Sequence, residues 1–341
     1  MPGLVLDMPA IERAARVLEQ GGLVAFPTET VYGLGADAEN PAAVARIYAA
    51  KERPSSHPVI VHVAQAAELA YWGVDIPDEA HQLISAFWPG PLTLILKRAA
   101  NIPAAVSGGQ DSIGLRCPSH PAALALLAAF KDGKGGIAAP SANKFGHVSP
   151  TTAQHVRDEF GEGLGNVVDC LLDGGQSEVG IESTILDLSR IASHGAVLLR
   201  PGQISVAQIA DVIGIQPRQP DQSAPRASGT LDAHYAPRTA LALVTQDKLP
   251  ALMQQLADAG RHVAVIHYST QHVTTALSQL ALPNDPSAYA HDLYAALRSM
   301  DAFNADVILV ESPPEIAAWQ GVNDRLRRAA FDSIRVLETL L

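Results

Sequence analysis

The sequence predicts an α/β protein: a larger domain built on a twisted mixed sheet, followed by a smaller three-layer α/β domain. The length of 341 residues favours two domains, at about 150 residues each. Short apolar runs alternate with segments whose apolar residues recur at helical spacing, which is typical of α/β folds. A polar stretch rich in Gln, Pro, Arg and Ser separates two such alternations and indicates a linker.

The first alternation predicts the larger domain over residues 1–214. Helix 10–20 follows from its apolar spacing and ends at a Gly-Gly pair, and helix 41–50 begins with Pro, which the first helical turn tolerates. Helices at 120–130 and 151–160 separate the earlier strands from the later ones. Strands are expected where apolar runs are bounded by Pro, Gly or Ser, over 23–26, 59–63, 92–96, 113–115, 166–172, 184–188 and 196–199. Hairpin-length loops between them favour a mixed sheet over a parallel one.

The second alternation follows the linker 215–238 and predicts a small Rossmann-like domain over residues 239–341. Its expected strands are 240–244, 262–266 and 307–310, and its expected helices are 248–259, 286–304 and 321–330. The strict alternation of the two kinds of segment indicates helices on the faces of a sheet.

Composition excludes several classes of protein. The net charge of −11 argues against a surface that is one nucleic-acid footprint. The two cysteines, Cys117 and Cys170, are too few for a disulfide framework or a four-cysteine metal site. The apolar run 122–130 has about half the length of a membrane-spanning helix, and acidic residues precede Arg13, the first basic residue, unlike a secretory signal. We therefore expect a cytoplasmic protein.

Polar side chains follow the first predicted strand. The segment 27–35, Pro-Thr-Glu-Thr-Val-Tyr-Gly-Leu-Gly, places hydroxyls and a carboxylate at the end of that strand, where α/β proteins hold ligands. The alternative is a polar turn whose glycines supply only positive φ angles. After the next helix, Lys51 and Arg53 are spaced to clamp a polyphosphate, although two solvated charges at a helix C-terminus would look the same. His62, inside a strand, is by itself typical of a core histidine.

Two further segments have candidate ligand groups. Arg116 ends a buried strand and therefore needs an anion, either an internal Asp or Glu or a substrate carboxylate. Nothing adjacent except this arginine would activate Cys117, so we interpret it as a packed thiol. The segment 140–143, Pro-Ser-Ala-Asn, precedes a helix start at Ser149 or Thr151, and such groups bind phosphate or cap the helix.

Common nucleotide and hydrolase motifs are missing from the sequence. There is no G-x-x-x-x-G-K-[ST] segment, no G-x-G-x-x-G after a strand, and no G-x-S-x-G elbow. Three other segments occur in a fixed order: Gly-Ile-Glu-Ser-Thr at 180–184, Leu-Arg-Pro-Gly at 199–202, and His-Tyr-Ala-Pro at 234–237.

Together these motifs closely resemble the threonylcarbamoyl-AMP synthases, in the long form that joins a YrdC/TsaC-like domain to a smaller C-terminal domain. The resemblance covers about residues 1–205 and the linker motif. It implies that L-threonine, bicarbonate and ATP condense to threonylcarbamoyl-AMP and pyrophosphate, for modification of tRNA by a downstream threonylcarbamoyl transferase machinery. Magnesium is expected to accompany ATP, with no metal site formed by the protein.

The resemblance also assigns roles to residues. Lys51 and Arg53 are expected to be catalytic, because phosphoryl transfer depends on positioning and charge neutralisation. The residues expected to bind L-threonine are Thr28, His62, Arg116 and Ser183. The residues expected to bind ATP are Lys51, Arg53, Ser112, Ser141, Asn143, Ser149, Arg200 and Tyr235, with Tyr32 as a further wall residue.

The linker resembles a loop that closes over the active site in this family. Ser228 stands where many relatives have Pro, which predicts a more mobile loop here. The competing interpretation is a double-stranded RNA or tRNA-binding module, and a weak or transient RNA contact stays open, but the sparse cations suit a small-molecule pocket better. A third interpretation is another carbamoyl-adenylate-forming enzyme with a different acceptor, as in hydrogenase maturation proteins that contain a related domain. Those proteins have additional zinc-finger and acylphosphatase-like segments, and this sequence has no cysteine pattern to match.

Overall fold

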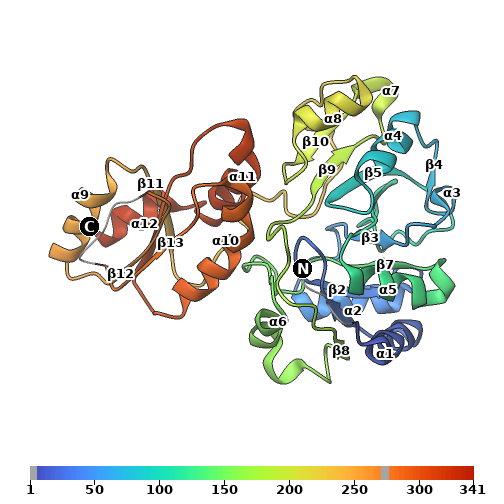
Figure 1. Cartoon of the computed structure of the whole chain (residues 1–341), viewed down its shortest axis with the longest axis horizontal. Helices are drawn as coiled ribbons and strands as arrows, with labels where there is room; N and C mark the ends of the chain where they lie inside the picture. Colours follow the sequence, from blue (N-terminus) through green and yellow to red (C-terminus); the bar gives the residue numbers. More distant parts are fainter. Residues whose placement is uncertain (1–5, 270–275) are drawn as a thin grey trace. The chain divides into compact units, whose positions relative to one another are not determined.

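The computed structural model describes residues 6–269 and 276–341 and forms two compact units. The first unit comprises Met1–Phe145 and Pro150–Thr230. The second unit comprises Gly146–Ser149 and Leu231–Leu341. Each unit contains one sheet with its own helices (Figure 1). Among the described residues, no helix is both long and apolar enough to span a membrane.

The first unit is built on a ten-stranded mixed sheet. Its strands are β1 (Val24–Phe26), β2 (Gly33–Asp37), β3 (Ile60–Val63), β4 (Gly73–Val74), β5 (Leu92–Arg98), β6 (Ser112–Arg116), β7 (Gly136–Ala138), β8 (Cys170–Leu171), β9 (Thr184–Asp187) and β10 (Val197–Arg200). Their order is β10-β9-β5-β6-β3-β7-β2-β1-β8, and β4 pairs with β5. The pairs β9–β5, β6–β3 and β1–β8 are parallel, and the other pairs are antiparallel. The predicted mixed sheet is confirmed.

Helices cover this sheet. They are α1 (Met8–Glu19), α2 (Pro41–Lys51), α3 (Leu69–Trp72), α4 (Asp78–Phe87), α5 (Pro121–Ala129), α6 (Ala153–Phe160), α7 (Ile191–His194) and α8 (Val206–Ile213), with short 3-10 turns at Phe130–Gly133 and Gly161–Gly163. Helices α1 and α5 lie side by side and pack on residues of β1 and β7 (Figure 1). Asn40 caps α2 by accepting from the N–H groups of Ala42 and Ala43, and Pro41 occupies the first turn as predicted.

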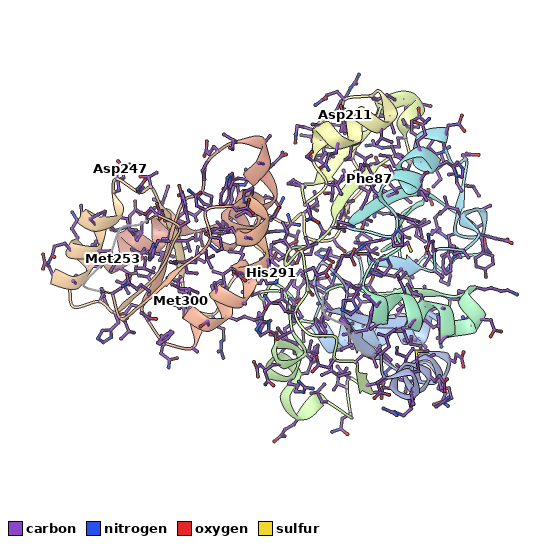
Figure 2. The ribbon with its side chains drawn as sticks, viewed as in Figure 1. Phe87, Asp211, Asp247, Met253, His291 and Met300 are labelled. Carbon is purple, nitrogen blue, oxygen red and sulfur yellow. The ribbon has the colours of Figure 1, made fainter. Side chains whose placement is uncertain are left out.

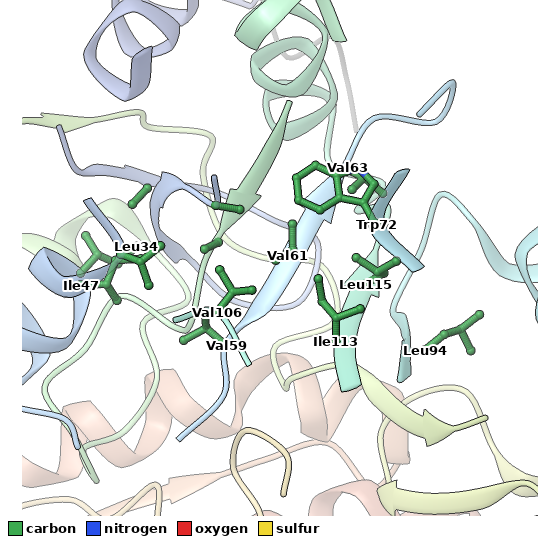
Figure 3. Close-up of a cluster of buried hydrophobic side chains, with 14 of the residues drawn as sticks. Leu34, Ile47, Val59, Val61, Val63, Trp72, Leu94, Val106, Ile113 and Leu115 are labelled. Carbon is green, nitrogen blue, oxygen red and sulfur yellow. The ribbon is translucent and has the colours of Figure 1, made fainter. Parts of the chain in front are cut away.

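Side-chain alternation gives the central strands two different faces. Val61, Leu94 and Leu115 point into the main hydrophobic core, which Figure 3 shows together with Trp72. The alternate residues on the same strands point to the opposite face. A smaller apolar cluster there, which includes Ile60 and Ile95, packs against Ala224 and Ala227 of the linker. The linker therefore packs on the sheet of the first unit.

The second unit has four parallel strands in the order β11-β14-β12-β13: β11 (Leu241–Val244), β12 (Val263–His267), β13 (Ser278–Ala281) and β14 (Val307–Glu311). Its helices are α9 (Leu249–Asp258), α10 (Pro286–Asp301), α11 (Gln320–Ala329) and α12 (Ser333–Leu340), with a 3-10 turn at Ala317–Trp319. Met253 on α9 and Met300 on α10 are both buried (Figure 2). This is the small Rossmann-like fold that the sequence predicts.

Some predicted elements were wrong in extent or kind. The strand expected over 166–172 is reduced to Cys170–Leu171, because a 3-10 turn and tight backbone hydrogen bonds occupy the residues before it. The segment 27–35 is a turn only as far as Tyr32, since Gly33 already begins β2. The elements that were not predicted are helices α3, α4, α7, α8 and α12 and strands β2, β4, β7 and β13. Strand β13 alternates half-buried with exposed residues, so it has no continuous apolar run.

Candidate functional site

A row of polar side chains crosses three neighbouring strands on the linker-covered face. Ile95 of β5 pairs with Gly114 of β6, which pairs with Ile60 of β3. Two residues away from these positions, on the same face of the sheet, lie Thr93 of β5, Arg116 of β6 and His62 of β3. All three are buried. The pleat of the sheet thus brings residues from three distant parts of the sequence together.

Next to this row lies a pocket with an apolar floor. Ile60, Ile95, Gly114 and Ile185 line it, with Ser112 at the same pocket. The linker forms the remaining wall through Arg226, Ala227 and Ser228, together with residues 58, 59 and 110. A Cβ at Gly114 would lie 3.2 Å from Ile95 Cδ1, so glycine keeps this floor open.

The turn after β1 is held by its own hydroxyl groups. Thr28 Oγ1 accepts from the N–H groups of Thr30 and Val31, both at 3.2 Å, and donates to the Val31 carbonyl at 2.6 Å. The Tyr32 hydroxyl donates to the Gly175 carbonyl at 2.8 Å, and burial raises the pKa of Tyr32 to about 12. The Tyr32 carbonyl also accepts from the Ala142 N–H, which joins this turn to the 140–143 segment.

Arg116 has an internal anion. Its Nη2 lies 2.7 Å from Glu29 Oε1, and both side chains are less than 5% exposed. Arg116 Nε donates to the Gly90 carbonyl, and Glu29 Oε2 accepts from the Ser119 N–H. The ion pair links the turn after β1 to the end of β6. Of the two partners considered for this arginine, the internal carboxylate is present.

Lys51 is a buried cation at the end of α2. Its Nζ donates to the Ser141 carbonyl at 2.5 Å and to the Asn143 carbonyl, so the side chain holds the 140–143 segment. Glu52, which follows, adopts a left-handed conformation that ends the helix. Burial, and next the neighbouring Arg53, lower the pKa of Lys51 well below its ordinary value. A ligand anion here would relieve that penalty.

Arg53 and Arg200 meet at one linker residue. Arg53 Nη2 donates to the Pro58 carbonyl at 2.8 Å and to Ser228 Oγ at 3.3 Å. Arg200 Nη1 donates to the Ser228 carbonyl at 2.9 Å. Two guanidinium groups that are both at least nine-tenths buried therefore converge on Ser228, at the wall of the pocket.

Ser183 belongs to the same group of contacts. Its hydroxyl lies 2.8 Å from Thr93 Oγ1 and accepts from Arg200 Nη2 at 3.2 Å. Gly202, at the end of the Arg-Pro-Gly segment, lies so close that a Cβ there would be 2.5 Å from the Thr184 backbone nitrogen. The predicted motifs at 180–184 and 199–202 are therefore packed on each other.

His62 is a neutral imidazole in this structure. Burial, and next the Arg116 cation, lower its pKa to about 3. Its ring meets the Phe26 ring edge-on at 6.0 Å between centroids. The Cys117 thiol is buried and its pKa is raised to about 11, chiefly by burial, as expected for a packed thiol.

Two predicted residues belong to the second unit. Ser149 is in the segment 146–149, and Tyr235 is in the last part of the linker, which belongs to this unit. Tyr235 is buried with a positive φ of 63°, its ring lies 5.8 Å from that of Tyr294, and Arg325 Cζ lies 5.5 Å above it. The structure thus brings the other predicted residues together within the first unit and holds Tyr235 among aromatic and basic residues of the second.

Sequence reasoning left several contributing residues without a role. Glu29 lies in the first motif, and the rule that a buried arginine needs a carboxylate is the signal that points to it. Thr93 is a hydroxyl inside an apolar run, which marks it as unusual. Gln110 pairs with the Arg226 backbone in both directions, at 2.8 Å and 3.1 Å, but only the fold brings these residues together. Among the described residues, no group of three or more His, Cys, Asp or Glu side chains is arranged to hold a metal ion.

Comparison with known proteins identifies the family. A family model described as "Telomere recombination" matches residues 16–202, and one described as "Threonylcarbamoyl-AMP synthase, C-terminal domain" matches residues 204–331. The threonylcarbamoyl-AMP synthase of Pyrococcus abyssi is 39% identical over 334 residues, covering 94% of each chain. That of Bacillus subtilis is 39% identical over 336 residues, covering 94% of this chain and 93% of its own.

A solved structure agrees with this result. The crystal structure of P. abyssi Sua5 complexed with L-threonine superposes with a TM-score of 0.87 and 36% sequence identity, covering 96% of each chain. Family membership favours an enzyme over an RNA-binding module. On the motifs, the fold and these similarities over nearly its whole length, the chain belongs to the threonylcarbamoyl-AMP synthase family.

Proposed function

We propose that this protein makes threonylcarbamoyl-AMP and pyrophosphate from L-threonine, bicarbonate and ATP. The threonine amine, in its neutral form, adds to CO2 and loses a proton, or attacks bicarbonate and displaces water, and either route forms a carbamate. A carbamate oxygen then attacks the α-phosphorus of ATP, and the bond to the β-phosphate breaks to release pyrophosphate. No protein nucleophile is needed, so positioning and charge neutralisation supply the catalysis.

Threonine is proposed to bind at the polar row. Arg116 Nη2 and Nε are held by Glu29 and Gly90, and its Nη1 makes no hydrogen bond with any described residue. That donor is suited to the threonine carboxylate. His62, being neutral, offers a ring nitrogen without repelling the threonine ammonium. Thr28 and Ser183 complete the proposed pocket.

ATP is proposed to occupy the apolar pocket and the cations beside it. The isoleucine floor is suited to the nucleoside, and Ser112 supplies a hydroxyl at the same pocket. Arg53 and Arg200, which now contact Ser228, would face the phosphates, so the linker must shift when ATP enters. Lys51 is proposed to neutralise charge on the reacting phosphate.

The remaining proposed nucleotide contacts follow from the family motifs. Ser141 and Asn143 are held in place by the Lys51 ammonium. The family resemblance also assigns Ser149 and Tyr235 to ATP, and both residues are described above with the second unit.

Magnesium is proposed to arrive with the triphosphate. The residues present fit this: Glu182 is buried and its charge acts on Lys51, so one carboxylate lies in the region proposed for the phosphates. One carboxylate plus phosphate oxygens is a common protein environment for this ion. When bound, it would neutralise charge on the leaving pyrophosphate. The product, an activated carbamoyl group, is proposed to be consumed by a transferase that acts on tRNA.

The observation that carries the proposal is that the buried Arg53 and Arg200 converge on Ser228 at the wall of an apolar pocket, on the sheet face that also carries the buried Arg116. The test incubates the full chain with ATP, magnesium and bicarbonate, with or without L-threonine, and follows pyrophosphate release and the adenylate by mass. Serine and valine serve as alternative amino acids. We expect an adenylate that requires both threonine and bicarbonate.

Variants separate the two proposed subsites. Arg116→Ala should raise the KM for threonine, Arg53→Ala should raise the KM for ATP, and Arg46→Ala, a surface ion-pair change on α2, should alter neither. If no amino acid yields an adenylate but the chain binds tRNA with a steep salt dependence, the enzyme proposal is wrong.

A further inference from the structure

The second unit has a buried carboxylate at the carboxyl end of its parallel sheet. Glu311, the last residue of β14, is fully buried. Its Oε2 accepts from the N–H groups of Tyr268 and Ser269, both at 3.0 Å, just beyond the end of β12. Ligands of α/β proteins bind outside the carboxyl ends of such strands.

Three oxygens in this cluster lack hydrogen-bond partners. They are Glu311 Oε1, Tyr289 OH and Ser269 Oγ, each buried at the atom and without a partner among the described residues. Glu311 forms no ion pair with any residue in the described ranges 6–269 and 276–341. A buried carboxylate that has N–H donors at only one of its oxygens is costly, and removing water from a hydroxyl without replacing its hydrogen bond costs further free energy. The arrangement therefore lacks a donor with positive charge.

Three aromatic rings pack together in this part of the second unit, and the Glu311 charge acts on two of them, Tyr268 and Tyr289. The Trp319 ring lies 5.3 Å from the Tyr289 ring and 5.9 Å from the Tyr268 ring, between centroids. Burial, and next the Glu311 charge, raise the pKa of Tyr289, so its phenol is neutral and has lone pairs that accept. Aromatic faces attract cations, which adds to the preference set by the carboxylate. Tyr268 and Ser269 are half-buried, so the residues beside the buried oxygens are partly exposed to solvent.

We propose that this cluster binds the primary ammonium group of a small amine. An ammonium group has three N–H donors and no acceptor, and each of the three oxygens has a lone pair that can accept from such a donor. Its positive charge would neutralise Glu311 in a charge-assisted hydrogen bond. A carboxylate accepts only, so phosphates and other anions do not fit. None of these residues belongs to the pocket proposed for ATP and threonine, and the site is independent of that proposal.

The test measures binding of methylammonium chloride to the full chain by calorimetry and thermal unfolding, without ATP or threonine. Tetramethylammonium at equal ionic strength has the same charge but no N–H donor. We expect saturable binding and a raised Tm with methylammonium and neither with tetramethylammonium. Glu311→Gln should weaken binding roughly tenfold or more, whereas Glu315→Gln, an exposed carboxylate in the segment after β14, should leave it unchanged.

Tyr289→Phe provides a second test that keeps the ring. It removes a hydroxyl without a partner, so the unliganded variant should unfold at the same temperature as the native chain or higher. Its affinity for methylammonium should fall severalfold. The proposal is overturned if methylammonium does not bind saturably, if tetramethylammonium binds equally well, or if Tyr289→Phe leaves the affinity unchanged. Water would then be the partner of the three oxygens.

Discussion

The buried ion pair between Arg116 and Glu29 offers the sharpest test of the site. The two side chains are 4% and 3% exposed and their charged atoms lie 2.7 Å apart. Glu29→Gln keeps the size of the side chain and an oxygen for the Ser119 N–H, but removes the negative charge. Arg116 would then be a buried cation whose remaining protein contact is a hydrogen bond to the Gly90 carbonyl.

The magnitude follows from this burial. Removing one partner of a buried ion pair costs about 3–5 kcal/mol, and the retained amide oxygen places the expected loss near the lower end. For a domain of this size, 1 kcal/mol shifts Tm by roughly 2–4 °C, so a fall of about 6–12 °C is expected. Because the guanidinium would lose its orientation, the KM for threonine should rise about tenfold or more.

Thermal unfolding and threonine-dependent adenylate formation measure the two effects. Glu12→Gln is the matched control, since Glu12 is exposed on α1. The double variant Glu29→Leu with Arg116→Met, which leaves no unpaired charge, should unfold at a higher temperature than Glu29→Gln alone. If Glu29→Gln behaves like Glu12→Gln in both measurements, the ion pair neither stabilises the fold nor orients the arginine, and the reasoning is refuted.

Three other changes have signs that the structure determines. The pKa of Lys51 is lowered in the folded chain, so the unfolded chain binds more protons below pH 10.5 and the native chain loses stability as the pH falls. Lys51→Met should therefore become more stable relative to the native chain as the pH falls below 10.5, and it should lose activity. Measurements of Tm across pH test the stability difference. The pKa of His62 is lowered from 6.5 to about 3, so the free energy of unfolding should fall by about 1.4 kcal/mol per pH unit as the pH falls through that window. His62→Gln should flatten this slope when acid unfolding is measured. Gly202→Ala should lower Tm and activity because its Cβ would lie 2.5 Å from the Thr184 backbone nitrogen. Gly163→Ala, whose Cβ would make ordinary contacts at 3.6 Å, should change neither. Equal Tm and activity in the two variants would contradict the predicted clash at Gly202.

The sequence alone determined the alternation of strands and helices and the division into a larger and a smaller α/β unit. Apolar runs such as 59–63 and 113–115 became buried strands, because burial of a strand requires little beyond continuous apolar side chains. The motif residues Lys51, Arg53 and Arg116 could be named as candidates since cations beside buried strands are unusual. Strand β4 has only two residues, too few for a periodic signal, and strand β13 has no continuous apolar run.

The tertiary structure decided which of these residues face one another. His62, Arg116 and Thr93 share a face because strand register fixes side-chain direction, and register depends on pairing between segments far apart in the chain. Likewise, the sequence left the anion of Arg116 open between an internal carboxylate and a ligand, and only the packing of the turn after β1 against β6 supplied Glu29. Local patterns specify local conformation; a site built from several strands exists only once long-range pairing has set their register.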